Sequence, residues 1–368
     1  MRDVLIIGGG PAGLIAAAEA AHHGASVLVV EEDPEVGKPD HCTGLVSKTG
    51  LDKIAEPDPS YVLNWISGVR IFAPSGRAYD VMTEENKACI IDRTRFDTSL
   101  LRLAERSGAE ILMGKTYPKD VQEQFKFIIN AEGTKGKVAK SLGFEAPKSI
   151  PAIQVDLETS DFEKDIVELH TGRWAPGFFA WKVPRGDHVR VGLGCYDGVP
   201  QELLQRMLEK NPNFSRIKGA KVLRTLYGKI VVGGPMRRTV RGNAMVIGDA
   251  GGFVKPTTGG GVVLGGLVAK IGGKSAAEAA MIGVSLESFQ RKWKKSYARE
   301  FRSMKLATRI FHNMKEDELE KALRMSHEAG ILGLIAGYDM DLQGKAVNRV
   351  LESRLIRFAV LPFLRSIF

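Results

Sequence analysis

The sequence predicts a mixed α/β (α+β) fold in three parts, and three observations carry this prediction. The chain opens with a buried strand, a glycine-rich turn and an alanine-rich helix, which is typical of a parallel sheet covered by helices. After residue 147, strand-like stretches follow one another with one helix among them, near residues 201–210, which favours a mainly antiparallel sheet. From about residue 285 the pattern is helical.

The parallel-sheet pattern returns at residues 244–247, so we expect the first domain to be interrupted by the second. Residues 66–82 predict a hairpin, and residues 33–60 predict a loop with a short helix. The predicted parts are a discontinuous first domain (1–65, 84–147 and 233–284), an inserted sheet domain (66–83 and 148–232) and a C-terminal helical region (285–368).

Composition and charge narrow the possible functions. The net charge of +9 suits nucleic acid, an anionic membrane surface or an anionic substrate. No basic block is interleaved with aromatic residues, so we expect no nucleic-acid partner. No apolar run reaches the ~18 residues that span a bilayer, so any membrane contact is expected to be peripheral. The three cysteines form no disulfide or metal pattern, and with no signal peptide this predicts a cytoplasmic chain.

The glycine-rich turn has the spacing Gly8-x-Gly10-x-x-Gly13. Gly8 allows a tight turn, Gly10 lets a pyrophosphate approach the backbone, and Gly13 lets helix and strand pack closely. Glu31 ends the next strand, and a carboxylate at this position can accept hydrogen bonds from ribose hydroxyls. An acid here also argues against NADP at this site. The pattern predicts a dinucleotide site, and the alternative is a purely structural turn. The site also includes Pro11, Ala12 and Glu32.

A second motif, Gly248-Asp249-Ala250, follows an apolar strand late in the chain. Together with the first turn it resembles the flavoprotein group that contains the aromatic hydroxylases. The resemblance implies a Rossmann-like FAD domain in which Asp249 holds the ribityl chain; the alternative is that Asp249 caps a helix. It also places Arg93, Tyr117, Ala131 and Gly133 near the cofactor, although Glu132 departs from the group's pattern.

Three further segments resemble the geranylgeranyl reductase family. They are the cysteine loop KPDHCTGLVS (38–47), the segment GFFAWKVP (177–184) and the glycine loop KPTTGGGV (255–262). Val183, Lys255 and Val262 depart from that family's usual residues. The resemblance implies a substrate wall of Phe179, Trp181 and Pro184. It implies flavin contacts from His41, Cys42, Thr43, Gly44, Pro256, Gly259, Gly260, Gly261 and Val262.

The family resemblance implies reduction of isolated C=C bonds in geranylgeranyl and other polyprenyl chains, notably those of archaeal membrane phospholipids. Such an alkene has no carbonyl to accept negative charge, so protonation coupled to hydride delivery is the easier route. Phe179 and Trp181 would stabilise developing positive charge, or they are ordinary sheet core. Cys42 would donate the proton or shape the site as the catalytic residue, or it is a small buried residue.

Two other functions stay open: a flavin monooxygenase, and a lipid-binding or electron-carrying flavoprotein without catalysis. The external reductant is equally open between NADPH, a ferredoxin and a deazaflavin. The C-terminal stretch 354–368 is apolar with three arginines. It would lie on an anionic membrane surface, close the substrate tunnel, or pack on the core as a terminal helix.

Overall fold

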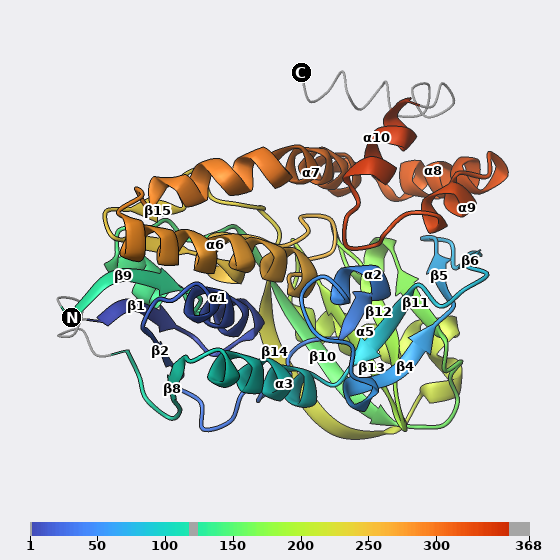
Figure 1. Cartoon of the computed structure of the whole chain (residues 1–368). Helices are drawn as coiled ribbons and strands as arrows, with labels where there is room; N and C mark the ends of the chain where they lie inside the picture. Colours follow the sequence, from blue (N-terminus) through green and yellow to red (C-terminus); the bar gives the residue numbers. More distant parts are fainter. Residues whose placement is uncertain (1, 118–123, 353–368) are drawn as a thin grey trace.

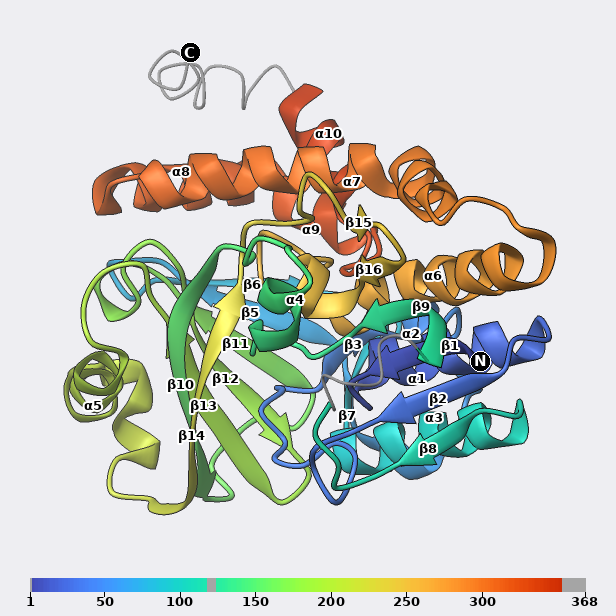
Figure 2. The same ribbon diagram turned by 90° about the vertical axis from the view of Figure 1, so that its left-hand side faces the viewer.

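The computed structural model describes residues 2–117 and 124–352 and shows three sheets and a set of C-terminal helices. A six-stranded and a seven-stranded sheet stand beside each other, and the C-terminal helices run along one side of both (Figure 1). The view turned by 90° shows the same arrangement (Figure 2). The α/β class with a helical C-terminal region is therefore confirmed.

The six-stranded sheet has the order β15-β16-β9-β1-β2-β8, and every pair is parallel except β15 with β16. Its central strands are continuous apolar runs buried on both faces, as a helix-covered parallel sheet requires. The strands are β1 (Arg2–Ile7), β2 (Val27–Val30), β8 (Glu110–Leu112), β9 (Phe125–Asn130), β15 (Val240–Arg241) and β16 (Ala244–Val246).

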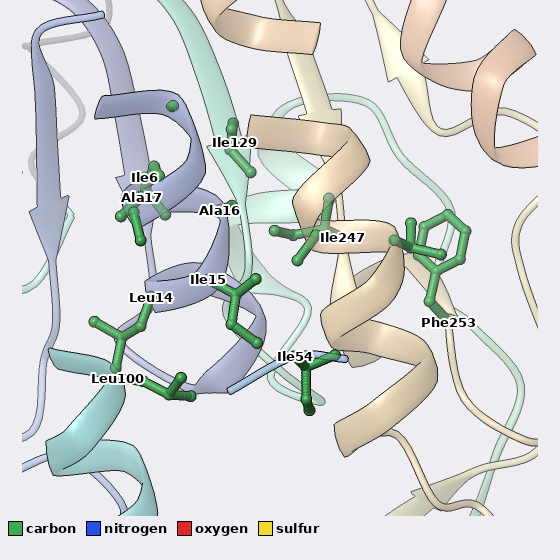
Figure 3. Packing of buried hydrophobic residues seen from close by; sticks show 14 of the residues in the cluster. Ile6, Leu14, Ile15, Ala16, Ala17, Ile54, Leu100, Ile129, Ile247 and Phe253 are labelled. Carbon is green, nitrogen blue, oxygen red and sulfur yellow. The ribbon is translucent and has the colours of Figure 1, made fainter. Parts of the chain in front are cut away.

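Helix α1 (Pro11–His22) packs between α3 (Arg93–Arg106) and α6 (Val262–Ile282). Small residues let α1 and α6 approach closely: a Cβ at Gly273 would stand 2.3 Å from the carbonyl oxygen of Ala16. Figure 3 shows the apolar side chains that fill this layer. Each fully buried Leu or Ile here contributes about 1.5–3 kcal/mol.

The seven-stranded sheet has the order β14-β10-β13-β12-β11-β5-β6 and is antiparallel except where β11 pairs with β5. The predicted hairpin forms β5 and β6 at its edge. Helix α5 (Pro200–Lys210) packs on this sheet. The strands are β5 (Gly68–Phe72), β6 (Ala78–Met82), β10 (Ser149–Glu158), β11 (Ile166–His170), β12 (Ala180–Arg185), β13 (His188–Gly194) and β14 (Lys221–Val231).

A third sheet has the order β3-β7-β4, and its strand β3 lies within residues 33–60, where a loop with a short helix is expected. Its strands are β3 (Leu45–Ser47), β7 (Ala88–Ile91) and β4 (Val62–Ile66). They are three to five residues long and pair across long sequence separations, so their strand character comes from tertiary pairing rather than from local periodicity. The short helices are α2 (Lys48–Leu51), directly after β3, and α4 (Lys137–Ser141).

The C-terminal helices pack against one another and against the seven-stranded sheet, because α10 contacts α7, α8 contacts α9, and α9 contacts β6. Among residues 2–117 and 124–352, no helix has the length and apolar character needed to cross a membrane. The segment 354–368, for which membrane contact, closure of the substrate tunnel and packing on the core are the alternatives above, lies outside the described residues. The helices are α7 (Glu287–Asn313), α8 (Glu316–Glu328), α9 (Ile331–Ala336) and α10 (Gly344–Glu352).

Candidate active site

A cavity of about 1520 Å³ runs between the six-stranded sheet, the seven-stranded sheet and the C-terminal helices. The glycine motifs line one part of it, and apolar side chains line another. The predicted site residues on its wall are Gly10, Pro11, Ala12, Glu31, His41, Cys42, Thr43, Arg93, Ala131, Gly133, Phe179, Trp181, Gly248, Asp249, Gly259, Gly260, Gly261 and Val262. Those outside the wall are Gly8, Gly13, Glu32, Gly44, Tyr117, Pro184 and Pro256.

The first glycine turn joins β1 to α1. Gly8 has φ +106°, and a Cβ at Gly13 would lie 1.9 Å from the Gly8 carbonyl oxygen, so both positions need glycine. A Cβ on Gly10 would meet no protein atom within 4 Å, which leaves room for a ligand at the start of α1. The positive end of the α1 dipole at this point suits a pyrophosphate.

The two acids after β2 have different surroundings. The Glu31 carboxylate accepts hydrogen bonds from the backbone N–H groups of Gly9 (2.5 Å) and Asp33 (2.8 Å), which fixes it beside the glycine turn. Glu32 is exposed and pairs with Lys135 instead. Burial, together with the Glu31 carboxylate, raises the pKa of Asp33. Of the two acids, only Glu31 lines the cavity.

Two residues singled out by the flavoprotein resemblance are Tyr117, a predicted cofactor contact, and Glu132, the departure from the pattern. Tyr117 lies after the end of β8 at Leu112, so it is not on a strand, and it packs half-buried beside the core at the other side of the sheet. Glu132, the departure from the flavoprotein pattern, accepts hydrogen bonds from the backbone N–H groups of Val138 (3.0 Å) and Ala139 (2.6 Å). It therefore holds the first turn of α4.

Asp249 follows β16 and borders the cavity. It is not the residue before a helix: the short 3₁₀ turn Gly248–Gly251 begins after Ile247, and α6 begins after Gly261. The helix-cap alternative for Asp249 is therefore wrong. A Cβ at Gly261 would lie 2.6 Å from Asp249 Oδ1, so glycine lets the carboxylate approach the start of α6. Burial raises the pKa of Asp249, and the nearby Arg93 opposes this.

The glycine loop 255–261 leads into α6, whose first residue Val262 lines the cavity. Lys255, where the resembled family has Asn, is 2 % exposed, and its Nζ lies 2.5 Å from Oδ1 of Asp341. The other carboxylate oxygen of Asp341 accepts a hydrogen bond from the backbone N–H of Ser47 at 2.6 Å. This ion pair ties the glycine loop to the segment between α9 and α10.

Cys42 is half-buried on the cavity wall, whereas Cys89 and Cys195 are fully buried in strand and sheet core. The backbone N–H of Gly44 donates to Cys42 Sγ at 3.4 Å, and the Arg93 guanidinium lies beside the same thiol. Burial alone would lower the pKa of Arg93, but the Asp97 carboxylate, at 2.7 and 2.8 Å, and Cys42 raise it well above its usual value. Burial raises the pKa of Cys89 to about 12.

The apolar part of the cavity begins at Phe179 and Trp181, whose rings meet edge to face at 6.2 Å. Both also pack in the core of the seven-stranded sheet, so each of their two predicted roles has a structural counterpart. The C-terminal helices form another part of the apolar wall, which the sequence did not reveal. The amphipathic character of α7, α8 and α10 indicates only that one face of each helix is buried. This part of the wall comprises Ala307, Ile310, Phe311, Met314, Leu319, Leu323, Leu332, Ile335, Val347 and Val350.

Comparison with known proteins agrees with this geometry. The model of the FAD-dependent oxidoreductase family matches residues 3–138. Digeranylgeranylglycerophospholipid reductase 2 of Methanothermobacter thermautotrophicus is 31% identical, over 96% of this chain and 95% of the relative. The chain belongs to the digeranylgeranylglycerophospholipid reductase family. It is an FAD-dependent oxidoreductase, and the room at Gly10 and the glycines around Asp249 fit its FAD.

Solved structures share the fold of this reductase family member. A geranylgeranyl bacteriochlorophyll reductase-like protein from Thermoplasma acidophilum matches with TM-score 0.86 and 21% identity, over 99% of this chain and 98% of that one. The p-nitrophenol 4-monooxygenase of Pseudomonas putida matches with TM-score 0.66 and 15% identity, over 97% of each chain. A reductase-like protein and a monooxygenase share this fold, so the fold alone does not determine the reaction.

Proposed function

We propose that this protein reduces isolated C=C bonds in geranylgeranyl chains of archaeal-type membrane phospholipid precursors. The observation that carries the proposal is the single cavity that joins the dinucleotide turn at Gly10 to the apolar chamber beyond Trp181. A dinucleotide alone would not need the apolar part of the cavity, whereas a long isoprenoid chain needs an apolar space that ends beside the flavin. The relatives named as digeranylgeranylglycerophospholipid reductases support this substrate class.

FAD, when bound and reduced, supplies the hydride. The chain's own contribution is to exclude water, orient the alkene and deliver a proton. Cys42 is proposed as the proton donor: its S–H proton goes to one alkene carbon while the hydride reaches the other, and the thiolate regains a proton from solvent. Phe179 and Trp181 line the same cavity as Cys42, and an aromatic wall would stabilise positive charge that develops on the tertiary carbon.

The external reductant is proposed to be NADPH, a ferredoxin or a deazaflavin. The net charge of +9 suits an acidic ferredoxin and equally an anionic lipid headgroup. Peripheral contact with an anionic membrane is proposed for the same reason. Co-sedimentation with anionic and neutral vesicles tests the contact, and binding to both kinds or to neither contradicts an electrostatic attachment.

The decisive experiment incubates chemically reduced holoenzyme with digeranylgeranylglycerophospholipid without oxygen and follows the lipid by mass spectrometry. We expect a gain of two hydrogens per reduced isoprene unit. Lipid that keeps its mass beside fully bound FAD would indicate a non-catalytic flavoprotein. A product that gains one oxygen atom when air is admitted would indicate a monooxygenase instead.

A further inference from the structure

The cysteine loop is held by its backbone carbonyl groups. Three successive carbonyl oxygens, those of His41, Cys42 and Thr43, accept hydrogen bonds from side chains of the seven-stranded sheet. The donors are Gln154 Nε2 to His41 (2.8 Å), Arg185 Nη1 to Cys42 (3.2 Å) and Thr43 (2.8 Å), and Arg190 Nη1 to Cys42.

The two arginines are deeply buried and charge-balanced. Arg190 is 0 % exposed and pairs with both oxygens of Asp156 at 2.6 and 2.9 Å. Arg185 is 4 % exposed and donates from Nη2 to Asp40, within the loop itself, at 2.6 Å. Arg224 also binds Asp156, at 2.8 Å, but makes none of the hydrogen bonds to the loop.

Buried ion pairs of this kind are costly to desolvate, and apolar side chains would stabilise a sheet equally well. Charged side chains are used here because they face the carbonyl oxygens of the cysteine loop, and buried carbonyl oxygens require hydrogen-bond donors. Gly44 fits the same arrangement: it has φ +82°, and a Cβ there would lie 3.1 Å from Arg185 Nη1 and 2.3 Å from the carbonyl oxygen of Ile91. The loop is thus shaped to receive the guanidinium groups.

We propose that Arg185 and Arg190, with Gln154, are positioning residues that clamp the cysteine loop and hold the Cys42 thiol at the cavity wall. The two arginines bind backbone carbonyl groups of the loop, and Arg185 also binds the Asp40 carboxylate. The Cys42 thiol itself is contacted by the Gly44 N–H group and by Arg93. This inference rests on the proposed function for its catalytic consequence. Its structural consequence, the fixed placement of the thiol, has a readout of its own.

That readout is alkylation of Cys42 in the oxidised holoenzyme. Cys89 and Cys195 are 0 % exposed, so iodoacetamide labelling of the folded protein reports on Cys42, with peptide mass spectrometry to confirm the site. We expect Arg185→Met to label about tenfold faster than the unaltered protein, since loss of charge-assisted hydrogen bonds favours local opening of the loop. Gln154→Leu loses one neutral bond and should label about two- to threefold faster.

Arg224→Met is the matched control, because it removes an arginine from the same cluster without touching the loop. It should lower the melting temperature and leave both labelling and lipid reduction unchanged. Arg185→Met should lower kcat for lipid reduction with little change in KM, and Arg185→Lys should restore part of it. If Arg185→Met fails to fold, Gln154→Leu and Arg185→Lys carry the same test.

The outcomes separate the two proposals. Equal labelling rates in Arg185→Met and Arg224→Met would overturn the clamp, whatever the lipid assay shows. Faster labelling in Arg185→Met, in a protein that reduces no polyprenyl lipid, would keep the clamp and reject the proposed substrate. Faster labelling with unchanged kcat would overturn the catalytic consequence of the clamp.

Discussion

The two ends of the cavity are built in different ways. The dinucleotide end is built on a short glycine turn whose residue types are dictated by backbone geometry, as at Gly8 and Gly13 behind the wall. At the apolar end, the wall comes from strands and helices up to about 280 residues apart, and each position requires only an apolar side chain of suitable size. The first end should therefore tolerate almost no change, and the second should respond by degrees.

The largest effect is expected at Gly13. Gly13→Ala places a Cβ 1.9 Å from a backbone oxygen, so the turn must move, and we expect an unstable protein that retains no FAD. Gly10→Ala is the matched variant, since its Cβ meets no protein atom. It should keep the thermal stability of the apoprotein and lose FAD affinity by about tenfold to a hundredfold. Differential scanning fluorimetry and flavin fluorescence measure both.

Cys42 tests the chemistry where the two ends meet. If it donates the proton, Cys42→Ala should lower kcat by about 10²–10⁴-fold with FAD still bound. Cys195→Ala, in the fully buried core, should change the free energy of unfolding and leave turnover as it is. Turnover in Cys42→Ala equal to that of the unaltered protein would reject a direct role for the thiol.

The charge cluster behind the cysteine loop predicts a pH dependence of stability. Burial alone would raise the pKa of Asp156, but Arg190 and Arg224 lower it to about 2. The value in the unfolded chain is about 3.9, so the ionised carboxylate contributes stability above that pH and loses it as the pH falls toward 2. We expect roughly 2–3 kcal/mol of the free energy of unfolding to be lost in this range.

Denaturant melts at several pH values check this, with Asp156→Asn as the comparison. The variant should start less stable near pH 6 and lose less as the pH falls. Parallel curves for the two proteins would show that the acid sensitivity arises at other carboxylates.

The smallest effect is expected at the apolar end. Phe311 of α7 lines the cavity, and Phe311→Trp would narrow it without introducing charge. We expect kcat/KM to fall about tenfold for geranylgeranyl chains and less for shorter prenyl chains, since a change of pocket volume gives only modest discrimination. A uniform fall for all chain lengths would mean that α7 does not bound the part of the channel that holds the chain end.

The same contrast explains what the sequence could predict. The glycine turn, Glu31, Asp249 and the glycine loop are local patterns with geometric causes, and the structure brings them to one cavity. The three-stranded sheet could not be predicted, because strands such as β3 exist only through pairing with distant β7. The contacts of the two arginines with the cysteine loop could not be predicted either, since nothing near Arg190 in sequence indicates that it faces the Cys42 carbonyl.

Sequence patterns also left out the C-terminal wall of the cavity. The sequence predicts that the C-terminal region is helical. A helical pattern indicates that one face of a helix is buried, but it does not indicate which residues pack on that face. Glu132 departs from the cofactor motif, and its hydrogen bonds with the start of α4 give it a role in this fold.

The buried ion pair between Lys255 and Asp341 bears on how this enzyme family could be re-engineered. Grafting the C-terminal helices of a relative that lacks the acid at 341 would leave the cation of Lys255 on the glycine loop without its partner. An unpaired charge left inside the protein costs several kcal/mol. A working chimera of this chain would therefore have to carry residues 255 and 341 as one inherited unit, together with a backbone donor equivalent to that of Ser47.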